Sequence, residues 1–370
     1  VAATSPDMYD TVDGYMDEYS AYDIDVKSPV GITVAAADKI SALDFVENSM
    51  PAKVVDLVLA ANLNGEDYTY TARVYATIDN AVTADADSKS VSKLNAFKLV
   101  DGKLPSSDDE CVVQSPAGKY LGGTPGIGDY LTVSDENSAF GGAGSVKYKK
   151  LKVVGIVNSP LCLSIAHEYT TVGTGTISLD VYTKQSFFTM DYFTDVFVTV
   201  KGAKRLDCFS DEYVDLVSSE VDEIAKIGDE LNPARVEQVS AELDKQISAI
   251  NAVADKMQAA ADVDKDLTED DVVRASQMLA LAESLAATNP ELAKSLTDTA
   301  NAILRAEKPT TNQTEAAVAA LRRQAEQLAA QKDLLGLAVW SVNTRADSVS
   351  YSTYQSNVGK VAALSKVFPA

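Results

Sequence analysis

Alternating hydrophobic and polar positions predict β-strands near the start of the chain. Residues 22–29 alternate apolar and charged side chains, which is typical of a strand with one buried face. Two further strand-like runs, 52–62 and 67–78, are separated by Asn64-Gly65, a dipeptide that favours a tight hairpin turn. Helical spacing accompanies them at residues 5–21 and 36–48. Residues 1–83 are therefore predicted to form a mixed α/β body.

The next part of the chain, residues 84–193, has a pattern of short strands and glycine-rich turns. Strands are predicted at residues 111–115, 130–134, 146–160 and 175–185. Glycine-rich segments such as 120–129 and 140–145 lie between them. Short strands at regular spacing with turn residues between them favour a small sandwich or barrel-like unit. Residues 194–210, which open with another strand, are predicted to return to the body.

Residues 211–334 are predicted to be a helical arm. In two stretches, 235–262 and 313–334, apolar residues recur at three- and four-residue steps, which is the heptad pattern of a coiled coil. We expect these two helices to pair antiparallel along a seam formed by Val236, Val239, Leu243, Ile250, Val253, Met257, Val318, Leu321 and Leu328. Two more helices are expected within 268–307, divided at Asn289-Pro290, where the asparagine caps the second one. Asn232-Pro233 is expected to break or kink the outgoing helix.

Strand character returns after the arm, in residues 335–345, which include the single tryptophan, Trp340. Because a tryptophan needs a core to enter, residues 22–78, 194–210 and 335–345 are predicted to share one sheet. The chain then continues as an amphipathic helix that ends near Phe368-Pro369. The predicted fold class is α+β, with a body that the arm interrupts in sequence.

The composition is strongly acidic and narrows the range of partners. The chain has 54 acidic and 32 basic residues, a net charge of −22 and a pI near 4.4. Such a surface repels nucleic acid and anionic lipid, so no nucleic-acid partner is expected. No stretch approaches the roughly 18–20 apolar residues that a membrane-spanning helix needs. The cysteines Cys111, Cys162 and Cys208 are expected to be free, buried thiols, and one pair among them is left open.

The sequence offers little catalytic chemistry. Its single histidine, His167, excludes sites that need a histidine pair and is expected to be an ordinary surface or loop residue. No P-loop motif occurs, and Gly126-Ile127-Gly128 precedes a strand rather than a helix, so nucleotide binding is not expected. Residues 262–273 begin like a calcium loop, but Leu267 and Val273 stand where glycine and glutamate are required. No catalytic residue, cofactor site or metal site is predicted.

Six segments of the chain, taken in their order along the sequence, carry a resemblance to a known family. They are residues 21–33, 99–113 (LVDGKLPSSDDECVV), 126–133, 151–164 (LKVVGIVNSPLCLS), 196–213 and 357–370. Together they resemble the large extracytoplasmic domain of bacterial ABC-transporter permeases of the FtsX/MacB type. The resemblance covers nearly the whole chain and implies a porter-like α/β body, a β-rich sabre-like subdomain and a long antiparallel coiled-coil arm. The implied ranges are 1–83, 194–210 and 335–370 for the body and its membrane-proximal helix, 84–193 for the sabre-like subdomain and 211–334 for the arm.

The resemblance also implies a function. The domain would lie on the extracytoplasmic side of the cell membrane, between two membrane helices, and would transmit their ATP-driven motion during export of a lipid, peptide or drug. A separate cytoplasmic subunit would bind ATP, a second permease copy would complete the transporter, and this chain would be no enzyme and hold no cofactor. An extracytoplasmic protein could contact the arm tip, where the candidate residues are Asp262, Asp264, Asp266, Asp270, Lys308 and Thr310.

Two other functions stay open at this point. The domain could switch on a partner such as a cell-wall hydrolase with nothing transported, or the chain could be a surface binding protein with a coiled-coil stalk. The amphipathic terminal helix favours a permease over a stalked surface protein. The sequence does not choose between export and activation. In each case the arm is expected to be dispensable for folding, so that joining residue 212 to residue 333 would leave the body intact.

Overall fold

The computed structural model describes residues 4–78, 94–115, 123–140, 143–164, 166–261, 269–286, 289–304 and 311–367. The fold is of the predicted α+β class, with a large mixed sheet and long helices. The chain divides into two compact units, the first formed by residues 1–232 and 339–370 and the second by residues 233–338. Of the helices that the structure describes, none is both long and apolar enough to cross a membrane.

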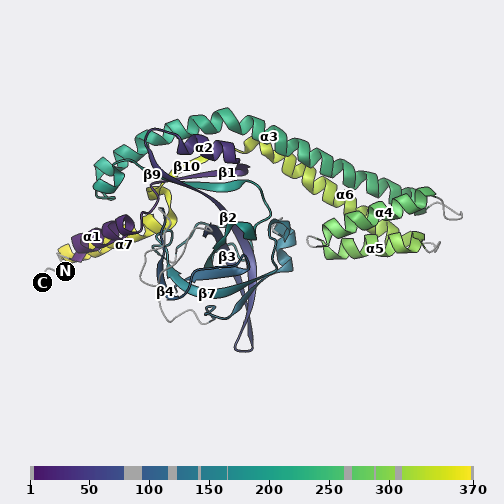
Figure 1. Cartoon of the computed structure of the whole chain (residues 1–370), viewed down its shortest axis with the longest axis horizontal. Coiled ribbons are helices and arrows are strands. Elements are labelled where there is room, and N and C mark those ends of the chain that lie inside the picture. The colour runs from purple at the N-terminus through teal and green to yellow at the C-terminus, as the bar shows by residue number, and fades with distance from the viewer. Residues whose placement is uncertain are drawn as a thin grey trace. The chain divides into compact units, whose positions relative to one another are not determined.

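The strands of the first unit form one ten-stranded sheet (Figure 1). They are β1 (Ile24–Ile32), β2 (Val46–Leu63), β3 (Glu66–Ile78), β4 (Lys98–Gly102), β5 (Glu110–Gln114), β6 (Tyr130–Val133), β7 (Lys150–Asn158), β8 (Leu179–Lys184), β9 (Phe193–Val200) and β10 (Ser341–Thr344). Their order is β10-β1-β9-β2-β3-β8-β5-β7-β4, and β6 pairs with β2 and β7. Strands from the beginning, middle and end of the chain are therefore neighbours. This confirms that residues 22–78, 194–210 and 335–345 contribute to one sheet.

Part of this sheet closes into a barrel. The first part of β2, Val46–Ala52, pairs with β9, whereas Lys53–Leu63 pairs with β3. From β3 the pairing continues through β8, β5, β7 and β6 and returns to β2. Alternate residues of these strands fill the interior, including Leu57, Leu59, Val74, Leu131, Val153 and Val181. The barrel-like unit is thus confirmed, but β2 and β3, expected in the body alone, form part of its wall.

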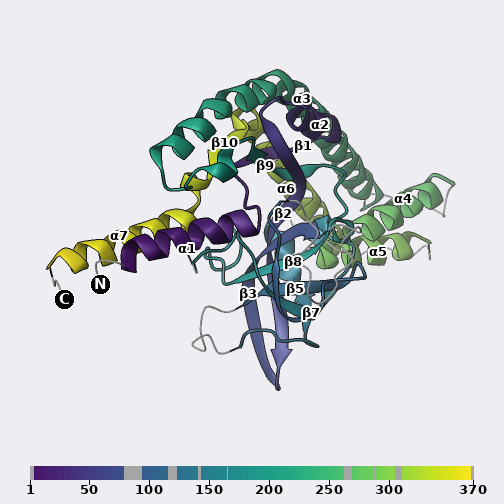
Figure 2. The same ribbon diagram turned by 60° about the vertical axis from the view of Figure 1, so that its left-hand side comes forward.

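Helices cover the other part of the sheet, formed by β1, β9 and β10 (Figures 1 and 2). They are α2 (Val34–Ser41) and the first part of α3 (Asp211–Ala261). Trp340, immediately before β10, packs against this core, as predicted. It lies so close to Gly228 of α3 that a Cβ there would be 2.9 Å from the indole ring. The glycine in the middle of a long helix is therefore explained by the tryptophan that packs on it.

The beginning of α3 belongs to the core of the first unit. Tyr213, Val217 and Ile224 are all buried there, beside strands β1 and β9. Joining residue 212 to residue 333 would remove these three side chains from the core, so the expectation that this deletion leaves the body intact is wrong. The boundary between the units lies after Asn232 instead.

The second unit contains the remainder of α3 together with α4 (Glu269–Leu285), α5 (Pro290–Leu304) and α6 (Thr311–Leu334). Helix α3 continues through Pro233, so of the two predicted outcomes, a break or a kink, the break does not occur. Ion pairs join Asp255 to Arg322 at 3.0 Å and Asp244 to Lys332 at 2.7 Å. Because the partner number falls as the other rises, α3 and α6 run antiparallel, as predicted.

The core of the second unit is shared by four helices and not by a pair. Ala275 and Met278 of α4 and Leu292 and Leu296 of α5 join residues of α3 and α6 in one buried cluster. The Oδ1 atom of Asn289 accepts a hydrogen bond from the Leu292 amide at 3.1 Å, which confirms this residue as the cap of α5. In the predicted seam, Ile250, Met257, Val318 and Leu321 are buried, Val253 and Leu328 pack against the cluster, and Val236, Val239 and Leu243 are half-buried.

Candidate functional site

The paired helices α1 (Thr4–Glu18) and α7 (Val349–Val367) are the first feature of the candidate site. They lie side by side in both views (Figures 1 and 2). The Tyr354 hydroxyl of α7 donates a hydrogen bond to the Met8 carbonyl of α1 at 3.0 Å. Val12 and Met16 of α1 and Tyr351 of α7 are buried in the core of the first unit. A displacement of either helix therefore acts directly on that core.

One short segment, residues 207–210, contacts both helices. The Phe209 ring lies 4.5 Å from the Tyr9 ring of α1 and 5.3 Å from the Tyr351 ring of α7, measured between centroids. The Tyr351 hydroxyl donates to the Cys208 carbonyl at 2.8 Å, and the Cys208 amide donates to Oδ1 of Asp13 at 2.8 Å. Because this segment leads directly into α3, it connects the paired helices to that helix.

A buried ion pair lies beside this segment. Nη2 of Arg345, the residue after β10, is 2.9 Å from Oδ1 of Asp23, the residue before β1, and each side chain is 6% exposed. The Tyr213 hydroxyl, in the first turn of α3, donates to the same carboxylate oxygen at 2.7 Å. The Arg345 guanidinium also lies over the Tyr213 ring, 5.1 Å from its centroid. Three elements that are distant in sequence thus meet at one charged group.

The rest of this network is satisfied by the backbone. Nε of Arg345 donates to the Tyr22 carbonyl at 2.9 Å, and Nη2 donates to the Ala21 carbonyl at 3.2 Å. Oδ2 of Asp23 accepts from the Val200 amide at 2.8 Å. Burial raises the pKa of Asp23 above its usual value, whereas Arg345 and the Val200 amide lower it by stabilising the carboxylate. We refer to these contacts, with Phe209 and Tyr213, as the junction.

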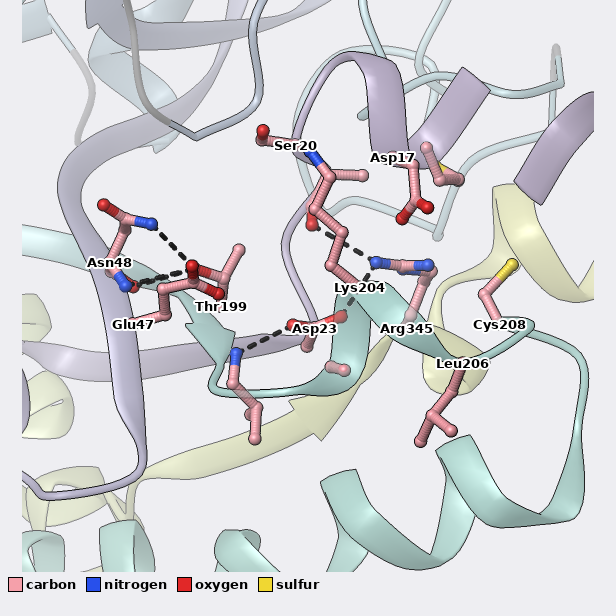
Figure 3. Close-up of a pocket in the computed structure, with 14 residues that line it drawn as sticks. Asp17, Ser20, Asp23, Glu47, Asn48, Thr199, Lys204, Leu206, Cys208 and Arg345 are labelled. Carbon is pink, nitrogen blue, oxygen red and sulfur yellow. Dashed lines mark hydrogen bonds and ion pairs between the residues drawn. The ribbon is translucent and has the colours of Figure 1, made fainter. Parts of the chain in front are cut away.

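A small polar cavity opens beside the ion pair, and its lining includes Asp17, Glu47 and Lys204 (Figure 3). Figure 3 shows the Arg345 side chain extending toward Asp23 at the wall of this cavity. The cavity has a volume of about 90 Å³, which is enough for ordered water. Pockets for drug-sized ligands measure about 300–1,000 Å³, so the cavity does not suit a lipid or a drug.

A second charged cluster lies further along β1. Nζ of Lys27 is 2.6 Å from Oδ2 of Asp25 and 2.7 Å from Oδ1 of Asp195, so two carboxylates share one ammonium group. Burial raises the pKa of Asp25 to about 7; Lys27 opposes this shift and the neighbouring Asp195 carboxylate adds to it. A cavity of about 40 Å³ lies next to the cluster, with Arg73 and His167 also in its lining.

The structure places only some of the residues singled out from the sequence. Asp262, Asp264, Asp266, Lys308 and Thr310 lie outside the described residues, as does most of the calcium-like segment. Asp270 is exposed on α4. His167 lies in a loop, as expected, but its side chain is only 10% exposed. All three cysteines are free thiols, Cys111 and Cys208 buried and Cys162 half-buried.

The junction was missed in the sequence. Asp23 and Arg345 are charged residues at the edges of predicted strands, which is also where solvated charges are common. Only the pairing of β1 with β10 brings them together, through the register that sets Ile24 opposite Thr344. A charged residue directly before a strand and one directly after another are the only signals that the sequence carried.

No protein-family model matches the sequence, and no curated protein matches it. Among solved structures the chain is similar to the periplasmic region of MacB from Actinobacillus actinomycetemcomitans, at 11% identity and a TM-score of 0.29, over 57% of this chain and 83% of that one. It is similar to the extracellular domain of the noncanonic ABC-type transporter YknZ from Gram-positive bacteria, at 16% identity and a TM-score of 0.27, over 53% and 93% of the two chains.

A third similar structure is a domain of a protein assigned as a permease from Porphyromonas gingivalis, at 11% identity and a TM-score of 0.27, over 55% and 82% of the two chains. These alignments are too distant to assign a role to any single residue, so the junction is interpreted from its own geometry.

Proposed function

We propose that this chain is the extracytoplasmic domain of an ABC-type permease and that it passes movements of α1 and α7 to the rest of the domain. The junction is the observation that carries this proposal. Through Phe209 the paired helices contact the segment that begins α3, and through Arg345 the segment between β10 and α7 holds both β1 and α3.

A buried ion pair with all its polar partners in place has few alternative arrangements, so a shift of Arg345 moves Asp23 and Tyr213 with it. Helix α3 is continuous from Asp211 to Ala261 and can carry that shift into the residues of the second unit. The domain in this proposal is a mechanical element.

The remaining parts of the transporter follow from the same proposal. The domain lies outside the cytoplasm, α1 and α7 lead to membrane helices, and two permease copies work with a cytoplasmic subunit that hydrolyses ATP. The transported molecule is an amphiphile such as a lipid, peptide or drug. The two cavities described above are too small to hold such a molecule, which favours a role in transmitting motion over a role as its container.

The test uses the full-length protein that carries this chain, reconstituted in lipid nanodiscs with its ATP-binding subunit. Spin labels are placed through encoded amino acids at two exposed positions, Asp10 on α1 and Asp215 on α3. We expect ATP to change the distance distribution between the labels, measured by electron-electron double resonance. Phe209→Ala should reduce this change, because it removes the ring that both helices contact.

A matched control is Tyr169→Ala, which truncates a ring that is 92% exposed and should leave the ATP effect as it is. An ATP-insensitive distance in the parent protein would refute the proposal. An ATP effect that survives Phe209→Ala in full would refute the role of the junction. Saturable ATP binding by the isolated 370-residue chain, measured by calorimetry, would refute the assignment of ATP to another subunit.

A further inference from the structure

A thiol, an imidazole and a carboxylate converge in the loop between β7 and β8. Oδ2 of Asp180, on β8, is 3.4 Å from Sγ of Cys162 and 3.2 Å from Nε2 of His167. The three potential ligand atoms all lie within 4.8 Å of one another. The mechanical proposal does not account for this cluster, which shares no residue with the junction.

We propose that Cys162, His167 and Asp180 form a zinc site with three protein ligands. Sulfur, imidazole nitrogen and carboxylate oxygen are the ligand types that Zn²⁺ takes in proteins. The combination of a thiolate with an imidazole favours zinc over calcium or magnesium, which prefer oxygen ligands alone.

The two distances from the Asp180 oxygen match those expected around a single zinc ion. Zn–S and Zn–N or Zn–O bonds of about 2.3 Å and about 2.0 Å in a tetrahedron put sulfur about 3.5 Å from oxygen and nitrogen about 3.3 Å from oxygen. The distances from the Asp180 oxygen are 3.4 Å to the sulfur and 3.2 Å to the nitrogen. The two separations that involve the Asp180 oxygen are therefore near-ideal for one zinc ion, and the sulfur and the imidazole nitrogen lie within 4.8 Å of each other.

The Asp180 carboxylate provides a second, independent observation. Its side chain is 5% exposed, and its Oδ1 atom has no hydrogen-bond partner among the described residues. A buried carboxylate oxygen without a donor costs free energy unless a cation or a water satisfies it. A zinc ion that binds this carboxylate would supply the missing positive charge.

Three protein ligands leave the fourth position of a tetrahedral zinc ion for a water molecule. Of the three proposed ligands, His167 also lines the cavity of about 40 Å³ described above, which is large enough for a water molecule. Without a cation, Sγ of Cys162 donates a hydrogen bond to Oδ2 of Asp180 at 3.4 Å. Zinc binding replaces that proton, which passes to solvent.

A second cluster, Asp13, Asp207 and Cys208, satisfies the same distance limit but is already used by the fold. Asp13 accepts from the Cys208 amide at 2.8 Å, and Asp207 accepts from the Phe209 amide at 2.9 Å. These two carboxylates hold the backbone of the junction. The cluster therefore serves as an internal control for zinc binding at Asp180.

An ion at the proposed site would stiffen the support of α7. The loop that carries Cys162 and His167 also contains Ser164, whose amide donates to the Ser350 hydroxyl in the first turn of α7 at 2.8 Å. Zinc would fasten this loop to β8 through Asp180. The site itself does not depend on the transport proposal, because it concerns only the geometry of these three side chains.

The experiment uses the full 370-residue chain, kept reduced and stripped of metal. Zn²⁺ is titrated against a competing chelator, and Co²⁺ is used as a spectroscopic probe of thiolate ligation. We expect one Zn²⁺ per chain and a thiolate-to-cobalt charge-transfer band. Cys162→Ser and Asp180→Asn should each weaken zinc binding at least about 100-fold, more than the loss of a residue outside the ligand set. Asp207→Asn should leave zinc binding unchanged.

A second measurement needs no variant and so does not depend on whether the variants fold. Alkylation of each cysteine in the unmodified chain is followed by peptide mass spectrometry with and without Zn²⁺. We expect zinc to slow the modification of Cys162 and to leave Cys111 and Cys208 unaffected. The proposal is overturned if zinc does not bind, if the Cys162 and Asp180 variants bind it as well as the parent does, or if zinc leaves the alkylation of Cys162 unchanged.

Discussion

Replacing Arg345 by methionine tests whether the junction holds the first unit together. The substitution keeps much of the side-chain volume and removes the guanidinium. It leaves the Asp23 carboxylate buried with only the Val200 amide and the Tyr213 hydroxyl as donors. It also removes the donors to the carbonyl groups of residues 21 and 22. Removing one partner of a buried ion pair costs about 3–5 kcal/mol, because the other charge remains in a medium of low polarity.

This cost should be visible in thermal unfolding. In a domain of this size each kcal/mol lowers the midpoint by about 2–4 °C, so Arg345→Met should lower it by about 6–20 °C. Trp340 is the only tryptophan and packs against the core of the first unit, so its fluorescence reports on this unit alone. The midpoint is therefore best measured by tryptophan fluorescence, because the helices of the second unit contribute strongly to circular dichroism.

Two further variants make the comparison decisive. Lys39→Met breaks the ion pair with Glu230, whose members are 49% and 67% exposed, and should cost less than about 1 kcal/mol. Asp23→Asn in the Arg345→Met background removes the uncompensated charge and should restore part of the lost stability. If Arg345→Met lowers the midpoint no more than Lys39→Met does, the reasoning about a buried, coupled junction fails.

Three other perturbations have expected outcomes. Burial raises the pKa of Asp25 to about 7 in the folded state, whereas the pKa of an aspartate in an unfolded chain is about 3.9. Between these two pH values the folded state binds more protons than the unfolded state, so the free energy of unfolding falls as pH rises across this range. Asp25→Asn should flatten this decline in urea unfolding, and an unchanged slope would contradict the assignment. Leu321→Asp places a charge at a fully buried position of the second unit and should remove much of its helical circular dichroism; a parental signal would refute the shared core. Replacing residues 233–338 by a short linker should leave the thermal transition seen by Trp340 fluorescence in place, because none of the described residues in that range belongs to the core of the first unit. Loss of this transition would contradict the boundary between the two units.

Several elements could be predicted because their cause is local. The strand-like runs at residues 22–29 and 67–78 correspond to β1 and β3, because strand character follows from residue types and turn residues within a short window. The alternation expected for residues 22–29 is only partly kept, since both faces of much of β1 are buried. The three- and four-residue steps around Ile250 and Leu321 placed α3 and α6 for the same reason. Asn289 could be identified as a cap because its side chain bonds to an amide only three residues away.

Other elements depended on contacts that no local pattern contains. The sequence predicted a break or a kink at Pro233, but the helix continues there without a break, because the helical residues on both sides outweigh the loss of one backbone hydrogen bond. Residues 211–232 were expected in the arm because their composition is helical. Tyr213 and Ile224 instead complete the core of the first unit, and which surface a helical face packs on is decided by the rest of the fold.

The candidate sites show most clearly which features the sequence determined and which the tertiary structure decided. The sequence by itself determined the fold class, the strands that return after the arm, the free thiols and the acidic character of the surface, all of which follow from residue type and short-range spacing. Only the tertiary structure decided that Asp23 meets Arg345, and that Cys162 and His167 meet Asp180. The first contact joins residues more than 300 positions apart through strand register. Because such register is set by the packing of whole strands, charged residues at strand ends carry no local sign of the partner that they will meet.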